Sequence, residues 1–195
     1  MKKTFLTLLF CMASLVASNS TASAQMMSDN KMMSGGNPTV GGAAMYKTKN
    51  IVENALNSPI HTTLVAAVKA AGLAETLMGK GPFTVFAPTN DAFDKLPAGT
   101  VETVLKPENK ATLTKILTYH VVAGRMDSKS IAKAIKRGNG TATFKTVSGD
   151  TLTATMQNGG VMLTDEKGGT AMVTTADVYQ KNGVIHVIDT VLMPN

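Results

Sequence analysis

The sequence has few of the residues on which several classes of protein depend. Tryptophan is absent, aromatic residues make up 5% of the 195 residues, and there is one cysteine. A surface that binds nucleic acid by stacking bases on aromatic rings between basic side chains is therefore not expected. Because a single cysteine, Cys11, cannot form an intramolecular disulfide, the stability of the fold has to come from a hydrophobic core.

Long apolar runs are missing beyond the first two dozen residues. No later run approaches the roughly 20 residues that a membrane-spanning helix requires. At the start of the chain, Lys2 and Lys3 precede an apolar stretch over residues 5–16, and Ala22-Ser23-Ala24 offers a small-x-small cleavage pattern. This arrangement is typical of an export signal. We therefore expect residues 1–24 to be removed and the mature protein to be periplasmic or secreted, without a transmembrane segment.

Charge is sparse as well. Charged residues make up 16% of the chain, with 19 basic and 13 acidic side chains and a net charge of +6. Removal of the predicted signal takes away Lys2 and Lys3 and leaves 17 basic against 13 acidic side chains, or +4. Such a mild balance, with lysines scattered along the chain, suits a weak attraction to anionic surfaces.

Residues 25–46 are rich in Met, Gly, Ser and Asn and show no hydrophobic period, which predicts a flexible leader. Two methionine pairs stand out there, Met26 with Met27 and Met32 with Met33. Thioether ligands suit Cu(I), so a periplasmic copper- or metal-handling protein is an alternative function. No histidine or cysteine accompanies the pairs, which favours a simple linker.

A strand that leads directly into a capped helix organises the rest of the chain. Phe83 to Ala87 are mostly apolar on both alternating faces, as in a strand that is buried on both sides. Pro88 ends the strand, Thr89 stands where an N-cap belongs, and Asp91 falls in the first helical turn. This pattern predicts a core strand and a helix, and it contains no nucleophile with a base beside it.

Before and after this stretch, apolar spacing and capping residues predict several short helices. Thr100 is expected to cap one of them, and His61 is expected to be a solvated turn residue. In the longest helix, His120 follows Leu113, Ile116 and Leu117 at helical spacing, so we expect a packed, hydrogen-bonded histidine. The predicted helical segments are residues 51–56, 64–71, 73–78, 101–105, 107–120 and 127–138.

The last third of the chain predicts a meander of β-hairpins. Its apolar segments are separated by turns that contain glycine, and they cover residues 141–147, 151–156, 161–164, 171–178 and 184–192. In the final strand His186 and Asp189 point to opposite faces, which argues against a catalytic His-Asp pair. Both faces are mostly apolar, so we expect a central strand with a buried histidine.

Three segments together resemble the fasciclin domain family (FAS1, beta-Ig-h3). The segments TVFAPTNDAF at residues 84–93 and NGVIHVIDTVLMP at residues 182–194 are similar to its two signature segments, and LTYHVV at residues 117–122 is similar to its Tyr-His segment. The resemblance covers residues 47–194, which we take as the domain. Four residues of the signature segments are assigned a structural role: Thr89, Asp91, His186 and Asp189.

This resemblance implies an α+β fold in which a small β-wedge or sandwich of hairpins is flanked by several short helices. It also implies a secreted or surface adhesion module with no known catalytic activity and no cofactor. The partner would be a cell-surface or matrix protein, a polysaccharide, or a second copy of the chain.

In vertebrate relatives the Tyr-His segment is associated with integrin binding, which makes Tyr119 and His120 the candidate binding residues by resemblance. Both lie where the helical pattern predicts burial, and a role in locking helix to sheet is favoured. An enzyme that uses His120 or His186 is a third hypothesis, disfavoured because no nucleophile motif accompanies either histidine.

Overall fold

The computed structural model describes residues 38–195. The predicted export signal, residues 1–24, and the methionine pairs at residues 26–27 and 32–33 fall outside the described residues and stay predictions. No helix within residues 38–195 is both long and apolar enough to cross a bilayer.

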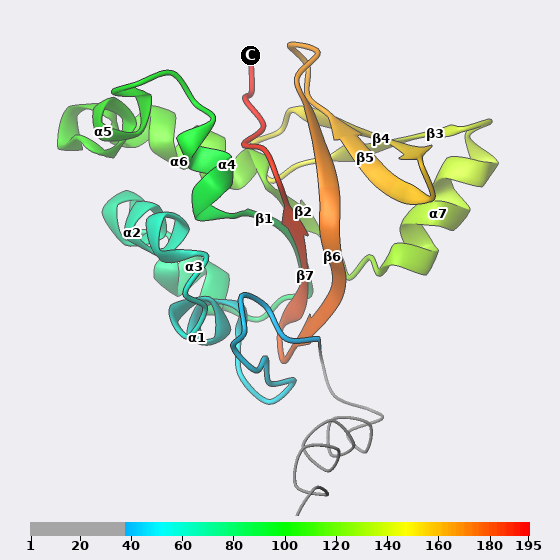
Figure 1. Cartoon of the computed structure of the whole chain (residues 1–195), viewed down its shortest axis with the longest axis horizontal. Helices are drawn as coiled ribbons and strands as arrows, with labels where there is room; N and C mark the ends of the chain where they lie inside the picture. Colours follow the sequence, from blue (N-terminus) through cyan, green and yellow to red (C-terminus); the bar gives the residue numbers. More distant parts are fainter. Residues whose placement is uncertain (1–37) are drawn as a thin grey trace, which may run out of the picture. The chain divides into compact units, whose positions relative to one another are not determined.

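A mixed seven-stranded sheet with the strand order β2-β1-β7-β6-β5-β4-β3 forms the centre (Figure 1). The predicted meander is confirmed, because β3 to β7 pair antiparallel in sequence order. The strand predicted to lead into the capped helix, β1, lies between β2 and β7 and is parallel to β7. Strand β7 lies between β1 and β6 and is therefore central, as predicted. The strands are β1 Phe83–Pro88, β2 Val121–Ala123, β3 Thr141–Lys145, β4 Thr151–Gln157, β5 Gly160–Thr164, β6 Thr170–Gln180 and β7 Gly183–Ile188.

The two edge strands of the sheet meet. Val122 in β2 forms an antiparallel bridge with Thr146, just beyond β3, and the Val147 amide donates to the Val121 carbonyl at 2.8 Å. Strand β6 has 11 residues and two irregularities in its pairing with β7, so it bends and contributes to both halves of the sheet. The sheet therefore curls into a nearly closed barrel.

Helices cover the two sides of this sheet unequally, with the first six on one side and α7 alone against β3, β4 and β5 (Figure 1). The side-chain cap at Thr89 forms as predicted, and Asn50 and Asp127 cap α1 and α7 in the same way. The predicted Thr100 cap is wrong, because Gly99 precedes the helix and Thr100 is its first residue. The helices are α1 Ile51–Leu56, α2 Thr62–Ala71, α3 Ala74–Met78, α4 Asn90–Asp94, α5 Thr100–Leu105, a 3-10 turn at Pro107–Asn109, α6 Lys110–Tyr119 and α7 Ser128–Arg137.

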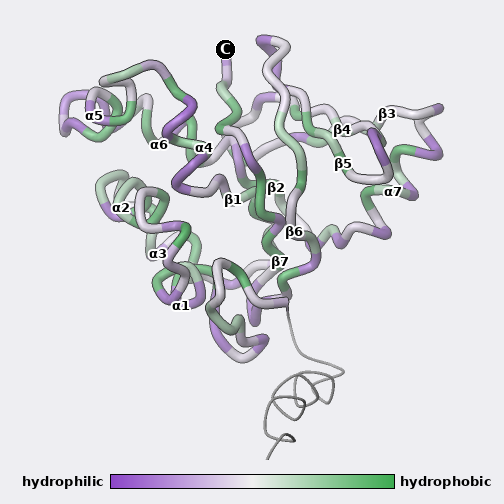
Figure 2. The backbone as a smooth tube through the Cα atoms, in the orientation of Figure 1, coloured by the Kyte–Doolittle hydropathy of each residue, from purple (hydrophilic) through white to green (hydrophobic). Residues whose placement is uncertain are grey.

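Two hydrophobic clusters lie on opposite sides of the central strands. Alternation along β1 sends Val85 and Ala87 to the cluster beneath α1 to α6, and Phe86 to the cluster between the sheet and α7. On α7, Ile131 and Ile135 are spaced by one helical turn and face the second cluster. The backbone coloured by hydropathy shows the central strands as largely hydrophobic (Figure 2). A core on each side explains why β1 and β7 read as apolar on both faces.

The folded unit begins upstream of Lys47, where we placed its start. Val40 and Met45 are buried in the first cluster. The side-chain amide of Asn54 in α1 bonds both backbone groups of Tyr46, accepting from its N–H at 3.0 Å and donating to its carbonyl at 2.7 Å. Residues 40–46, which we assigned to the leader, thus contribute to the core.

Candidate functional site

The Tyr-His segment lies at the end of α6, with Tyr119 as its last residue and His120 at its C-cap. Both side chains are buried, with 0% and 3% of their surface exposed. Tyr119 packs in the second cluster and its hydroxyl donates to the Thr151 carbonyl at 2.8 Å, so it ties α6 to β4. Burial raises the pKa of the Tyr119 phenol to about 12, which keeps the hydroxyl protonated as a donor.

His120 joins α6 to the segment that follows β7. The Leu192 amide donates to Nε2 at 3.1 Å, so Nε2 is unprotonated and the ring proton is on Nδ1, which donates to the Ile116 carbonyl at 2.8 Å. Burial lowers the pKa of His120, while its backbone bond and the nearby Asp165 carboxylate act in the opposite direction. This geometry fits the predicted locking role. A binding role for the two side chains stays a prediction.

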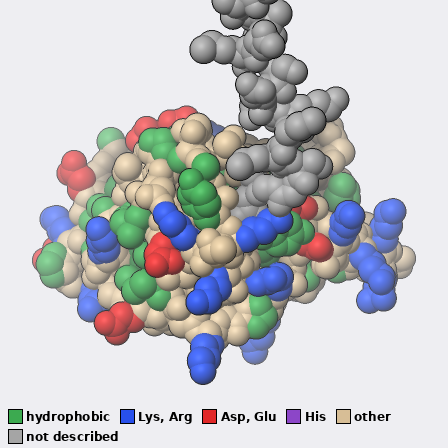
Figure 3. Space-filling view, turned by 90° about the horizontal axis from the view of Figure 1, so that it is seen from below, with side chains coloured by type: hydrophobic (Ala, Val, Ile, Leu, Met, Phe, Trp, Pro, Cys, Tyr) green, Lys and Arg blue, Asp and Glu red, His purple; other side chains and the backbone are tan. Residues whose placement is uncertain are grey.

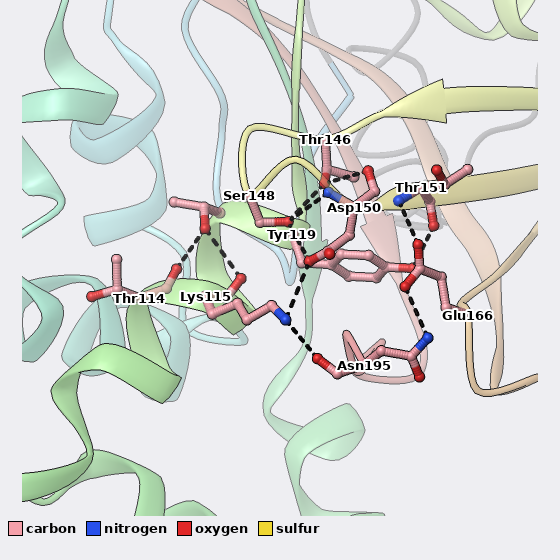
Figure 4. Close-up of polar contacts among 10 residues, drawn as sticks. Thr114, Lys115, Tyr119, Thr146, Ser148, Asp150, Thr151, Glu166 and Asn195 are labelled. Carbon is pink, nitrogen blue, oxygen red and sulfur yellow. Dashed lines mark hydrogen bonds and ion pairs between the residues drawn. The ribbon is translucent and has the colours of Figure 1, made fainter.

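Polar side chains lie on the surface around the buried tyrosine (Figure 4). Lys115 on α6 donates to the Asn195 carbonyl at 2.5 Å and lies 3.8 Å from the Asp150 carboxylate. Glu166 accepts from the Thr151 amide at 2.9 Å and from the Asn195 side chain at 3.0 Å. These contacts connect α6, the β3–β4 turn, the β5–β6 turn and residue 195, so the surface over Tyr119 is a set of satisfied structural contacts.

His186 in β7 is also held by structural contacts. The Asp177 amide donates to Nδ1 at 3.4 Å, which places the ring proton on Nε2, and Nε2 donates to the Met126 carbonyl at 2.8 Å. The ring stacks on Phe86 with 5.6 Å between centroids. Burial lowers the pKa of His186, partly offset by its bond to Met126 and by the Asp177 carboxylate.

Asp189 does not meet His186. Its Oδ1 accepts from the Met172 amide at 2.9 Å, and its Oδ2 lies 3.8 Å from Lys95 Nζ. In the other signature segment, Thr89 accepts from the Ala92 amide at 3.3 Å as the cap of α4, whereas Asp91 is exposed in the first turn. All four residues are thus placed where a structural role is possible, and that assignment stays a prediction.

The prediction that His61 is a solvated turn residue is wrong. Only 3% of its surface is exposed, and its Nδ1 lies 2.8 Å from the Ser58 hydroxyl. Burial lowers the pKa of His61. The chain folds back between Ser58 and His61, and the sequence alone did not indicate that the fold would cover the ring. All three histidines of the chain are therefore buried.

Within residues 38–195 there is no group of three or more His, Cys, Asp or Glu side chains that could hold a metal ion. The methionines considered as Cu(I) ligands, Met26, Met27, Met32 and Met33, lie outside the described residues. A copper-handling role for these methionines stays a prediction.

An open groove of about 880 Å³ lies at the end of the domain where α1, α3 and the β6–β7 turn meet. It brings together Lys80, Arg125 and Lys181 with one carboxylate, Glu53. These cations lie in three separate loops, so no local sequence pattern could have indicated them. We call this hollow the basic groove. Its lining residues are Thr48, Asn50, Glu53, Met78, Gly79, Lys80, Gly81, Pro82, Arg125, Lys181 and Asn182.

Comparisons with known proteins agree with the resemblance seen in the sequence. The profile of the Fasciclin domain matches residues 59–194. Protein sll1483 of Synechocystis sp. is 50% identical over 152 residues, which are 78% of this chain and 77% of that protein. The cell surface glycolipoprotein MPB83 of Mycobacterium bovis is 37% identical over 164 residues, 81% of this chain and 67% of that protein.

A solved structure shares the fold. It is described as a FAS1 domain pair from the insect cell adhesion molecule fasciclin I, and it superposes with a TM-score of 0.65 at 18% identity. The superposition covers 74% of this chain and 51% of that chain, as expected when one domain matches half of a pair. The predicted α+β fold with flanking short helices is thereby confirmed.

Proposed function

Because this chain belongs to the fasciclin domain family, we propose that it is an exported, non-enzymatic interaction module that binds a cell-surface or matrix partner through its single fasciclin domain. The partner would be a protein or a polysaccharide, and self-association is a further mode. The family includes proteins that act in adhesion, which supports an interaction module in general. The specific partner and the export of the chain are the proposed part.

The state of the histidines carries this proposal. Histidine is the side chain that titrates nearest to neutral pH, and it is the commonest general acid or base in enzymes. Here His61, His120 and His186 are all buried. His120 and His186 each use both ring nitrogens in contacts with backbone groups. No ring is presented to a substrate, which favours recognition by the surface over catalysis.

The proposed location rests on two observations. Residues 1–24 have the layout of an export signal, and the related MPB83 is described as a cell surface protein. We propose a periplasmic or extracellular site of action. Fractionation of the source cells, followed by N-terminal sequencing of the mature protein, tests this directly. A chain that starts at Gln25 outside the cytoplasm is expected, and an uncleaved cytoplasmic chain would contradict it.

The function itself is tested by a binding screen of the purified mature protein against intact source cells, envelope polysaccharides, matrix proteins and itself. We expect saturable binding to at least one of these. The parent is compared with a variant in which Met26, Met27, Met32 and Met33 are replaced by isoleucine. Binding that survives this replacement belongs to the domain. Loss of Cu(I) binding in the same variant, with no binding to any surface by either protein, would favour the copper alternative.

A further inference from the structure

We propose that the basic groove binds the carboxylate groups of an acidic polysaccharide. The inference rests on the proposed interaction function and names the surface and the chemical class of the partner. The Tyr-His segment has no part in this contact, because its side chains are buried at the end of α6.

The cations of the groove are available to a ligand. Among residues 38–195 the ion pairs are Lys95 with Asp189, Lys106 with Glu108, and Lys115 with Asp150. None of them involves a lysine or arginine of the groove, and Lys80, Arg125 and Lys181 are all exposed. Arg125 donates to the Gln180 carbonyl at 3.3 Å, a contact that leaves its positive charge unpaired. The lining therefore carries three exposed positive charges that no carboxylate within residues 38–195 pairs.

The one carboxylate in the lining is already engaged. Glu53 accepts from the Asn50 amide at 2.7 Å, while the Asn50 side chain accepts from the Glu53 amide at 2.9 Å. This reciprocal pair is the capping box of α1. The negative charge of Glu53 thus has a structural role at the start of a helix, and the balance of the lining stays positive by two charges.

The groove is built from interlocked segments. Asn182 accepts from the Ile51 amide at 3.1 Å and donates to the Leu77 and Gly79 carbonyls at 2.7 and 3.1 Å. The Lys181 amide donates to the Lys49 carbonyl at 2.9 Å. One turn therefore holds α1, α3 and the chain before α1 together. A site preorganised in this way avoids the entropic cost of ordering loops on binding.

The shape and lining favour an extended, moderately charged chain of sugars. The groove is open, and its volume of about 880 Å³ far exceeds the size of a single inorganic anion. Met78, 43% exposed, lines the groove and offers apolar surface for a sugar ring. Viewed from below, basic side chains outnumber acidic ones on the visible part of the surface (Figure 3).

Nucleic acid fits this lining less well. Its binding draws on many phosphate contacts and, for single strands, on a row of stacked aromatic rings. The groove supplies three cations and no aromatic residue in its lining. A polyuronate carries one carboxylate per sugar. It therefore needs fewer cationic side chains than nucleic acid does, and these can lie farther apart.

The test measures binding of the full mature chain to immobilised alginate, with neutral dextran and double-stranded DNA as comparison surfaces. The groove variant carries Lys80→Gln, Arg125→Gln and Lys181→Gln. Its matched control carries Lys133→Gln, Lys136→Gln and Arg137→Gln on the exposed face of α7, so both lose two lysines and one arginine. Thermal unfolding of each variant verifies that the replacements leave the fold intact.

We expect alginate binding that weakens with added salt, about tenfold weaker binding by the groove variant, and parental binding by the α7 control. Equal losses in both variants, equal binding to DNA, or no alginate binding at all would overturn the groove assignment. The proposed function is judged separately by binding to intact cells. If the parent binds cells and the groove variant binds them equally well, the assignment of binding to the groove is wrong, whereas the proposed interaction function is retained.

Discussion

Replacement of His120 by alanine is expected to destabilise the domain by about 3 kcal/mol. The substitution removes two hydrogen bonds, from Nδ1 to the Ile116 carbonyl and from the Leu192 amide to Nε2. Each bond contributes about 1 kcal/mol to stability. Leu192 is fully buried, so its amide is left without a partner, which costs about 1 kcal/mol or more in addition.

A second substitution separates the two bonds. In His120→Asn the side-chain amide can occupy the position of Nδ1 and donate to Ile116, while nothing reaches Leu192. We expect a loss of about 2 kcal/mol, mostly from the unpaired Leu192 amide. Tyr119→Phe, which removes only the hydroxyl that donates to Thr151, serves as the neighbouring comparison, with an expected loss of about 1 kcal/mol.

The assay is urea unfolding at neutral pH, followed by far-UV circular dichroism. For a unit of this size, 3 kcal/mol corresponds to a fall of roughly 6–12 °C in the midpoint of thermal unfolding. If His120→Ala unfolds at the same urea concentration as the parent, the two bonds do not help to hold α6 to the segment that follows β7. The reasoning about the Tyr-His segment would then be refuted.

Acidification is expected to destabilise the fold through its three histidines, because burial lowers each folded-state pKa below the ordinary value of about 6.5. Their contribution is complete above about pH 6.5 and is lost as the pH falls toward the folded-state pKa values; an unfolding free energy unchanged between about pH 7 and 5 would contradict this. Thr89→Ala removes the cap of α4 and should cost about 1 kcal/mol in urea unfolding, whereas no measurable loss would mean that the cap bond at 3.3 Å contributes nothing. Gly183→Ala should cost about 3 kcal/mol, because a Cβ there would lie 2.1 Å from the Phe83 carbonyl oxygen and push β7 away from β1; a parental melting temperature would show that the strands adjust freely.

Local patterns predicted the elements of the fold well. The cap at Thr89, the apolar spacing of α6 and α7, and the glycine turns of the hairpins each involve residues within a few positions of one another. The residues that determine such local interactions are therefore all found in one short stretch of sequence. Burial of His120 followed from the same local spacing, and its partner Leu192 did not, because 72 residues separate them.

The features that could not be predicted depend on contacts between residues far apart in the sequence. The parallel pairing of β1 with β7 joins segments a hundred residues apart, and the sequence of neither strand indicates which strand pairs with it. His61 is buried by parts of the fold that are distant in the sequence. Val40 and Met45 are part of the core although the stretch that contains them shows no hydrophobic periodicity. The basic groove is the same kind of case, since its cations come from three loops.

The central claim is that this domain recognises its partner through its surface and uses the Tyr-His segment to hold itself together. Adhesion to intact source cells tests it most directly, comparing His120→Asn with the groove variant at a temperature where both are folded. The account predicts parental binding by His120→Asn and weakened binding by the groove variant. Loss of binding by the folded His120→Asn protein, with parental binding by the groove variant, would contradict it.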